Sequence, residues 1–271
     1  MKFSFNTFND SAYFGLQTDP RRYGAAAARA GFDLIGLDFP TIAAFCRRGG
    51  KVAEIARAFS DEGIGCSTVT AAGMYGDGNS VTEVTTLAAE CAVTLGADFL
   101  QSNFMSSELD RQLAELEEAC RAVESVQPGL VIALEHLPGF GLDNLNDSIR
   151  LAQSVGYDRA RVLVDIWHVS HSADTWEDVE TMPMEALAYL ELDDALPRIS
   201  DDLAAEMTSR RTFPGQGVLE VDRFCRSFAD RGFDGMISVE VISERWRGGD
   251  LFEFARRCLE TGRAAWENAI G

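Results

Sequence analysis

The sequence is poor in histidine and in basic residues, and it contains no long apolar run. Its 271 residues include three histidines, and 43 acidic side chains outnumber 24 basic ones, giving a formal net charge of −19. Such a chain repels a phosphate backbone, so we expect no nucleic-acid partner. Nowhere do 18 apolar residues run together, so we expect no membrane span. Divalent cations and small neutral substrates remain compatible.

Cysteine motifs are also missing. The six cysteines are scattered without a CxxC pair or a Cys/His cluster, so we interpret them as reduced thiols that pack in strands and helices. The first residues, MKFSFNTFND, lack the basic segment, apolar run and cleavage site of a signal peptide. We therefore expect a cytoplasmic protein.

Short apolar runs of strand character recur at intervals of about 30 residues. Helix-like segments with apolar residues at three- and four-residue spacing lie between them, and this alternation demands parallel strands joined by crossovers. The predicted strands are Phe3–Thr7, Leu34–Asp38, Cys66–Ala71, Phe99–Asn103, Leu130–Glu135, Val162–Asp165, Ala188–Leu192 and Met236–Val241. The predicted helices are Pro20–Ala30, Val52–Glu62, Val81–Leu95, Leu109–Val126, Asn146–Ser154, Val221–Asp230 and Leu251–Trp266.

Eight such units predict a (β/α)8 TIM barrel, with residues 1–271 as a single domain. An open doubly wound sheet is the alternative, but no G-x-G-x-x-G follows the first strand and there is no P-loop. Two connections depart from the repeat. Ser170–Met182 is polar with a short predicted helix at Thr175–Thr181, and Asp193–Gly217 is long enough to form a lid or a substrate-binding element.

Four consecutive predicted strands place an acidic residue at or near their carboxyl ends: Glu135, Asp165, Glu191 and Glu240. In a closed barrel these ends converge, and four carboxylates would repel one another strongly. A divalent cation turns that repulsion into binding. Because all four ligands are oxygens, Mn²⁺ or Mg²⁺ is favoured, with Zn²⁺ or Co²⁺ as alternatives.

Five segments resemble the xylose isomerase-like TIM barrel superfamily, also called the sugar phosphate isomerase/epimerase family. They are ALEHLPG, VLVDIWHVSHSADTWEDV, YLELDDALP, RRTFPGQGVLEVDRF and ISVEVISERWR. The resemblance implies one divalent metal held by Glu135, Asp165, Glu191 and Glu240. It also implies that His168, in a D-x-x-H pattern, and Arg211, in R-x-x-P-G-x-G, face the substrate.

Glu191 departs from the family pattern, which usually has a neutral Gln or His at this position. Four carboxylates around one divalent ion leave a charge of about −2, unless Arg211 or a proton neutralises part of it. Either the site binds cations strongly, or Glu191 is not a ligand, or the barrel has lost its metal. We favour the first interpretation.

Three further residues are candidates for substrate contact. Trp167 and Trp246 follow strand ends and could form apolar walls, although packing at the barrel top explains them equally well. Asn103, at the end of the fourth predicted strand, could bind substrate hydroxyls or serve a turn. His136 follows Glu135 directly, so on a strand it would point away from the metal ligand.

The resemblance and the carboxylates together predict an isomerase or epimerase of a sugar, keto-sugar or related polyol. Glu135 and Glu240 would exchange a proton with the carbon beside a carbonyl that the metal polarises. A lyase or dehydratase acting by β-elimination on a keto-sugar, inosose or keto-glycoside could use the same residues. A metal-free, non-catalytic barrel is the third hypothesis. Few histidines and the acidic charge argue against the superfamily's DNA-repair nuclease branch, and a homodimer or homotetramer stays open.

Overall fold

The computed structural model describes residues 1–76 and 78–271 and contains a closed barrel of eight parallel strands. Each strand pairs with its two neighbours around the barrel, and β1 pairs with both β2 and β10, which closes it. The barrel strands, in chain order, are β1 (Lys2–Asn6), β2 (Leu34–Asp38), β3 (Gly65–Tyr75), β4 (Phe99–Phe104), β5 (Val131–Leu134), β6 (Ala160–Asp165), β7 (Leu187–Leu192) and β10 (Met236–Val239). The predicted (β/α)8 fold is confirmed.

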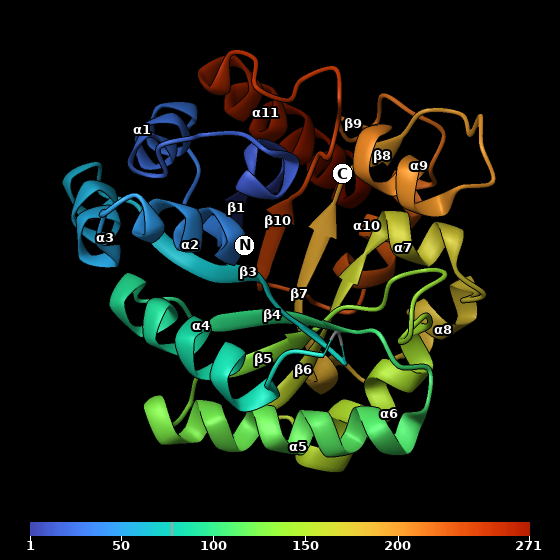
Figure 1. The fold of residues 1–271 in the computed structure, drawn as a ribbon. Coiled ribbons are helices and arrows are strands. Elements are labelled where there is room, and N and C mark those ends of the chain that lie inside the picture. Colours follow the sequence, from blue (N-terminus) through green and yellow to red (C-terminus); the bar gives the residue numbers. More distant parts are fainter. Residues whose placement is uncertain (77) are drawn as a thin grey trace.

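Helices surround the barrel on the outside (Figure 1). The first helix packs against the last, so the outer ring closes as the strands do. The helices are α1 (Arg21–Ala30), α2 (Phe39–Arg47), α3 (Val52–Asp61), α4 (Val81–Leu95), α5 (Leu109–Val126), α6 (Leu145–Val155), α7 (Ile166–His171), α8 (Trp176–Thr181), α9 (Leu203–Ser209), α10 (Val221–Ala229) and α11 (Leu251–Ile270). Three 3₁₀ turns add Phe8–Asp10, Ala12–Phe14 and Met184–Ala186. Among the described residues, no helix combines the length and apolarity needed to cross a bilayer.

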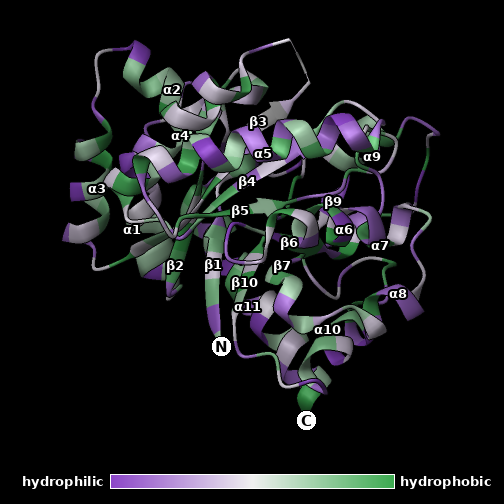
Figure 2. Cartoon of the chain, turned by 90° about the horizontal axis from the view of Figure 1, so that it is seen from below, coloured by the Kyte–Doolittle hydropathy of each residue, from purple (hydrophilic) through white to green (hydrophobic). Residues whose placement is uncertain are grey.

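The main apolar core lies between the strands and the helices, and Figure 2 shows outer helices such as α5 alternating hydrophobic and hydrophilic residues. A smaller cluster, which includes Ala133, Leu163 and Tyr189, is separate from it. These three residues precede Glu135, Asp165 and Glu191 by two positions. Because side chains alternate along a strand, the two sets face the same side. An apolar layer therefore lies one step below the carboxylates.

Most predicted elements agree with the structure to within a few residues, and the bounds of α4 and α5 are as predicted. The short helix expected near Thr175–Thr181 is α8. Three helices were not predicted: α2, α7 and α9. The long connection Asp193–Gly217 contains α9 and a two-stranded antiparallel sheet of β8 (Asp194–Ala195) and β9 (Arg211–Thr212). It is therefore a structured element at the barrel mouth.

Candidate active site

The four predicted carboxylates come together at the carboxyl ends of adjacent strands. Glu135, Asp165, Glu191 and Glu240 are all buried, and one carboxylate oxygen from each lies within 4.8 Å of the others. Asp165 and Glu191 are paired in register across β6 and β7. The outer two carboxylates belong to the ends of β5 and β10, so they flank the inner pair. The sequence prediction of a carboxylate cluster is confirmed.

Amide side chains of β4 hold Glu135. Nδ2 of Asn103 donates to Oε2 of Glu135 over 2.8 Å and to its backbone oxygen over 3.2 Å. Nε2 of Gln101 donates to the same Oε2. Gln101 and Asn103 are two residues apart and therefore face the same side of the strand. Together they fix one oxygen of Glu135 and leave Oε1 for His168.

His168 approaches Glu135 because α7 starts directly after Asp165. Oδ1 of Asp165 accepts the backbone N–H of Trp167 over 2.7 Å and caps this helix. His168 then lies in the first turn, with Nε2 3.1 Å from Oε1 of Glu135 and 3.2 Å from Oδ2 of Asp165. The spacing of Asp and His by three residues is thus explained by one turn of helix.

The first strand supplies a residue that the sequence analysis missed. Nδ2 of Asn6 donates to Oε1 of Glu191 over 3.1 Å and to Oε1 of Glu240 over 2.8 Å. Oγ of Ser238 also donates to Oε1 of Glu191 over 3.1 Å. These neutral donors bind carboxylate oxygens without adding charge, so they position the two acids but leave their mutual repulsion in place.

Arg211 supplies one positive charge to the cluster. Its Nη1 lies 2.7 Å from Oδ2 of Asp165, 3.2 Å from Oε2 of Glu240 and 2.5 Å from Oδ2 of Asp193. The pairing of β8 with β9 brings this arginine back over the barrel, opposite Ala195. Arg211 therefore contacts two of the four predicted metal ligands, together with an acid that the sequence analysis did not identify.

The pKa values of the four acids shift in two directions: burial and mutual repulsion raise them, whereas His168 and Arg211 lower them. Burial raises the pKa of Glu240 to about 8, against the charge of Arg211, and it raises the pKa of Glu191 well above the usual value, aided by the charge of Glu240. Burial also raises the pKa of Glu135, but the hydrogen bond and the charge of His168, together with the hydrogen bond from Asn103, leave the pKa of Glu135 below normal. Burial also raises the pKa of Asp165, but the charges of Arg211 and His168, together with the hydrogen bonds from Arg211 and the backbone N–H of Trp167, outweigh burial and leave this pKa below normal. The protein alone thus leaves part of the cluster's charge uncompensated.

This donor set fits a divalent cation. Four carboxylate groups can each offer an oxygen within a space of 4.8 Å, and hard cations prefer such ligands. His168 adds a nitrogen that forms a second possible group with Glu135 and Asp165. The raised pKa values of Glu191 and Glu240 indicate an excess of negative charge that a cation would offset.

A cavity of about 210 Å³ opens beside the cluster. Its polar side is formed by Thr70, Gln101, Asn103, Glu135, His168, Thr208, Arg211 and Glu240, and its apolar side by Phe8, Tyr13, Pro40, Ala71, Leu137, Phe140, Met207 and Ile242. Asn103, His168 and Arg211, predicted to contact a substrate, line this cavity together with Glu135 and Glu240. Within the described part of the chain, Arg211 is the only lysine or arginine among its lining residues.

The two predicted tryptophan walls lie elsewhere. Trp167 is buried, stacks on His171 with ring centroids 4.1 Å apart, and lies under the guanidinium of Arg211. Trp246 packs on Phe213 and lines a neighbouring hollow. Neither tryptophan is among the described lining residues of the 210 Å³ cavity. Aromatic contact there comes from Phe140 and from the first connection, through Phe8 and Tyr13, whose ring centroids lie 5.6 Å apart.

His136 points away from the cluster's centre, as its position after Glu135 predicts. Its Nε2 lies 3.2 Å from Oδ2 of Asp174, and its ring meets that of His168 edge-on with centroids 5.9 Å apart. Oδ1 of Asp174 also accepts the backbone N–H of Leu145 at the start of α6. His136 therefore links the loop after β6 to the back of His168.

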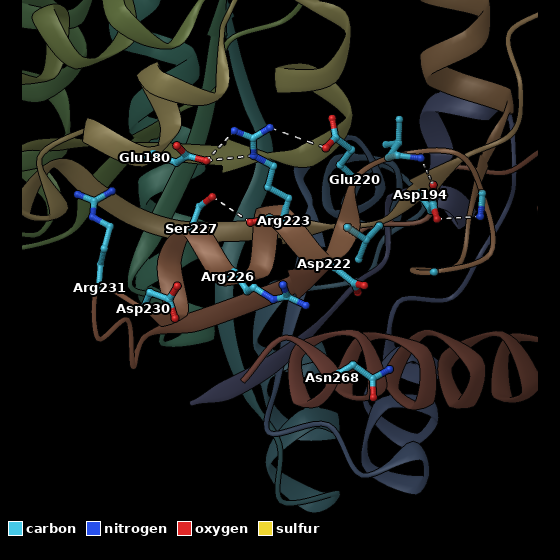
Figure 3. A pocket seen from close by; sticks show the side chains of 14 residues that line it. Glu180, Asp194, Glu220, Asp222, Arg223, Arg226, Ser227, Asp230, Arg231 and Asn268 are labelled. Carbon is cyan, nitrogen blue, oxygen red and sulfur yellow. Dashed lines mark hydrogen bonds and ion pairs between the residues drawn. The ribbon is translucent and has the colours of Figure 1, made fainter. Parts of the chain in front are cut away.

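A larger hollow of about 910 Å³ lies beside α10 (Figure 3), and none of its described lining residues also lines the cavity at the carboxylates. Arg223 there pairs with Glu180 at 3.0 Å. Asp194 accepts the backbone N–H groups of Gly217 and Leu219 over 2.7 and 2.9 Å. A Cβ at Gly217 would lie 2.2 Å from the backbone oxygen of Ala195. Asp194 and Gly217 thus build the turn that follows β9.

Comparison with known proteins agrees with this geometry. A family model described as xylose isomerase-like TIM barrel matches residues 25–262. The chain belongs to the xylose isomerase-like TIM barrel family. An inosose isomerase from Halalkalibacterium halodurans is 23% identical over 149 residues, which cover 52% of this chain and 50% of that protein. The match thus spans about half the length of that relative.

Several solved structures share the fold of the whole chain. A zinc-bound IOLI protein superposes with a TM-score of 0.85 at 16% identity, covering 99% of both chains. An L-ribulose 3-epimerase superposes with a TM-score of 0.76 at 17% identity, covering 99% of this chain and 95% of the other. A D-allulose 3-epimerase from Methylomonas sp., in complex with D-allulose, superposes with a TM-score of 0.74 at 15% identity, covering 98% of this chain and 97% of the other. At such identities the likeness concerns the fold.

Proposed function

We propose that this protein is a divalent-metal-dependent isomerase or epimerase of a small sugar, keto-sugar or related polyol. The observation that carries the proposal is the arrangement of Glu135 and Glu240. Both line the 210 Å³ cavity, and both belong to a group of four acids whose oxygens lie within 4.8 Å. The related inosose isomerase and the epimerases of the same fold support the reaction class.

Glu135, Asp165, Glu191 and Glu240 would hold the metal, for which Mn²⁺ or Mg²⁺ suits the all-oxygen set and Zn²⁺ or Co²⁺ are alternatives. A bound divalent ion would act as a Lewis acid and draw electron density from a substrate carbonyl. Arg211 and His168, which line the cavity on the same side, would orient substrate oxygens. The two amides of β4 keep Glu135 fixed while it acts.

The proton transfer would be shared by the two outer glutamates. Glu135 and Glu240 end strands on either side of the inner pair, so they would approach a bound carbon from two directions. One carboxylate removes the proton beside the carbonyl and the other returns a proton, which changes the configuration or moves the carbonyl. The apolar residues that line the cavity would restrict water beside the reacting carbon, while the two carboxylates would exchange their protons with solvent between turnovers.

The cavity favours an uncharged substrate of small size. Its single arginine is already paired with three carboxylates, so no free cation among the described lining residues is available to bind a phosphate. A volume of about 210 Å³ is below the range of sites for drug-sized ligands. We therefore expect free sugars or polyhydroxy ketones to be turned over in preference to their phosphates.

Exchange of substrate hydrogen with D2O tests the proposal. Wild-type protein loaded with Mn²⁺ should incorporate deuterium from D2O into a keto-sugar, as measured by mass spectrometry. Glu240→Gln and Glu135→Gln should each lower the rate of incorporation by at least about 100-fold. Glu244→Gln, at an exposed glutamate near Glu240, is the matched control and should retain full activity. Product analysis also separates isomerisation from β-elimination, the alternative reaction for these residues. Full turnover by Glu240→Gln would contradict the proposed role.

A further inference from the structure

We propose that Asp193 is a positioning residue that fixes the guanidinium of Arg211 at the carboxylate cluster and strengthens the attraction of the cluster for a divalent cation. Because Arg211 lines the cavity, we expect Asp193 to affect substrate affinity as well, and that part of the inference rests on the proposed function. The part concerning the cation rests on the arrangement of charges alone.

Asp193 is fully buried and lies directly between β7 and β8. Its Oδ2 is 2.5 Å from Nη1 of Arg211. Its Oδ1 has no hydrogen-bond partner in residues 1–76 and 78–271. Removing a carboxylate from water is costly unless it is paired. The contact with Arg211 offsets part of this cost.

Asp193 contacts the same nitrogen of Arg211 as two acids of the carboxylate cluster. Nη1 of Arg211 contacts Asp165 and Glu240 as well as Asp193, and Asp193 is the nearest of the three. The arginine's one positive charge is thus divided between the cluster and an acid outside the predicted ligand set. Without the charge of Asp193, more of that positive charge would act on Asp165 and Glu240, and a cation would bind less tightly.

The same contacts fix the direction of the arginine side chain. Nε of Arg211 donates to the backbone oxygen of Met207 over 3.2 Å, and Nη1 is engaged by the carboxylates. Nη2 lies 3.4 Å from Nε2 of His168, and both residues line the cavity. With Nε and Nη1 held, the guanidinium plane is set, and a group that binds substrate oxygens is pre-organised.

Asp193→Asn tests both parts, because asparagine keeps the shape and one acceptor oxygen but removes the charge. Mn²⁺ binding to EDTA-stripped protein is measured by calorimetry, and kcat and KM are measured with the best keto-sugar. We expect the Mn²⁺ Kd to rise about tenfold and KM about tenfold, with kcat within about threefold because Glu135 and Glu240 are untouched. Asp201→Asn, at an exposed acid, changes the net charge equally and should behave as wild type.

The inference would be overturned if Asp193→Asn bound Mn²⁺ with the same Kd as wild type, or if the variant lost activity only through kcat. Failure of the proposed function looks different: the wild-type protein would bind Mn²⁺ but convert no sugar, and the Mn²⁺ Kd of the variant would still decide the role of Asp193. If Asp193→Asn does not fold, Asp193→Ser is measured in the same way. Arg211 keeps Asp165 and Glu240 as partners in both variants, so failure of both to fold would also overturn the inference.

Discussion

Nδ2 of Asn6 lies 2.8 Å from Oε1 of Glu240 and donates a hydrogen bond to it, which ties the first strand of the barrel to the last. The same amide reaches Glu191 on β7. A neutral donor at the point where the barrel closes thus holds two acids that repel each other. This relationship makes Asn6 part of the candidate site, although it lies more than 100 residues before Glu135 in the sequence.

Asn6→Ala should lower the free energy of unfolding by about 1–3 kcal/mol, because two buried carboxylates lose a donor that water cannot easily replace. Urea denaturation at neutral pH measures this change. Asn268→Ala, at an exposed asparagine on α11, is the control and should stay within about 0.5 kcal/mol of wild type. Equal stability of the two variants would mean that the amide of Asn6 does not support the acids.

Gly217→Ala should destabilise the protein by about 2 kcal/mol or more, because the added Cβ meets the backbone oxygen of Ala195 at 2.2 Å and the carboxylate of Asp194 at 2.4 Å. Gly36→Ala is a suitable control, since its Cβ would meet its nearest neighbour at 3.6 Å. Thermal unfolding compares the two. A Gly217→Ala variant as stable as Gly36→Ala would show that the turn after β9 can relax.

Asp38, which lies outside the carboxylate cluster, should make the free energy of unfolding depend on pH. Burial raises its pKa to about 6, against hydrogen bonds from Ser11 and Thr41, whereas its unfolded value is 3.8. The folded state therefore prefers the protonated acid. The resulting stabilisation is fully present below pH 3.8 and is lost as the pH rises through 6, and it amounts to about 3 kcal/mol.

Asp38→Asn removes this titration. Its stability relative to wild type should therefore rise by up to about 3 kcal/mol between pH 4 and pH 7. Guanidinium unfolding at several pH values measures the difference, which cancels the contribution of other acids. Asp201→Asn, at an exposed acid, serves as the control. A difference that stays constant over this range would contradict the raised pKa of Asp38.

The cluster could be predicted from the sequence because each of its acids ends an apolar run. Glu135, Asp165 and Glu191 interrupt patterns of buried strands, and a charge in such a place demands a partner. Asn6 and Gln101 carry no charge, and a neutral amide near a strand end also fits a turn. Their role follows only from the way the barrel closes and from the alternation of side chains on β4.

Two other features could not be predicted, because the local sequence at each gives a misleading pattern or none. The segment IWHVSH contains β-branched and aromatic residues that favour strands, yet the cap from Asp165 starts α7 there. This helix turns Trp167 under Arg211 and away from the cavity. The pairing of Asp193 with Arg211 depends on the β8–β9 sheet inside a connection whose sequence gives no strand pattern.

Elemental analysis of the purified protein, combined with thermal melts in EDTA, Mg²⁺, Mn²⁺ and Zn²⁺, tests the central claim most directly. The account predicts about one divalent ion per chain and a melting temperature that rises with Mn²⁺, since a ligand at 100 times its Kd adds about 2.7 kcal/mol. Glu240→Gln should lose most of the rise, and Glu244→Gln should keep it. No bound metal and no shift in wild-type protein would contradict the metal centre and favour a non-catalytic barrel.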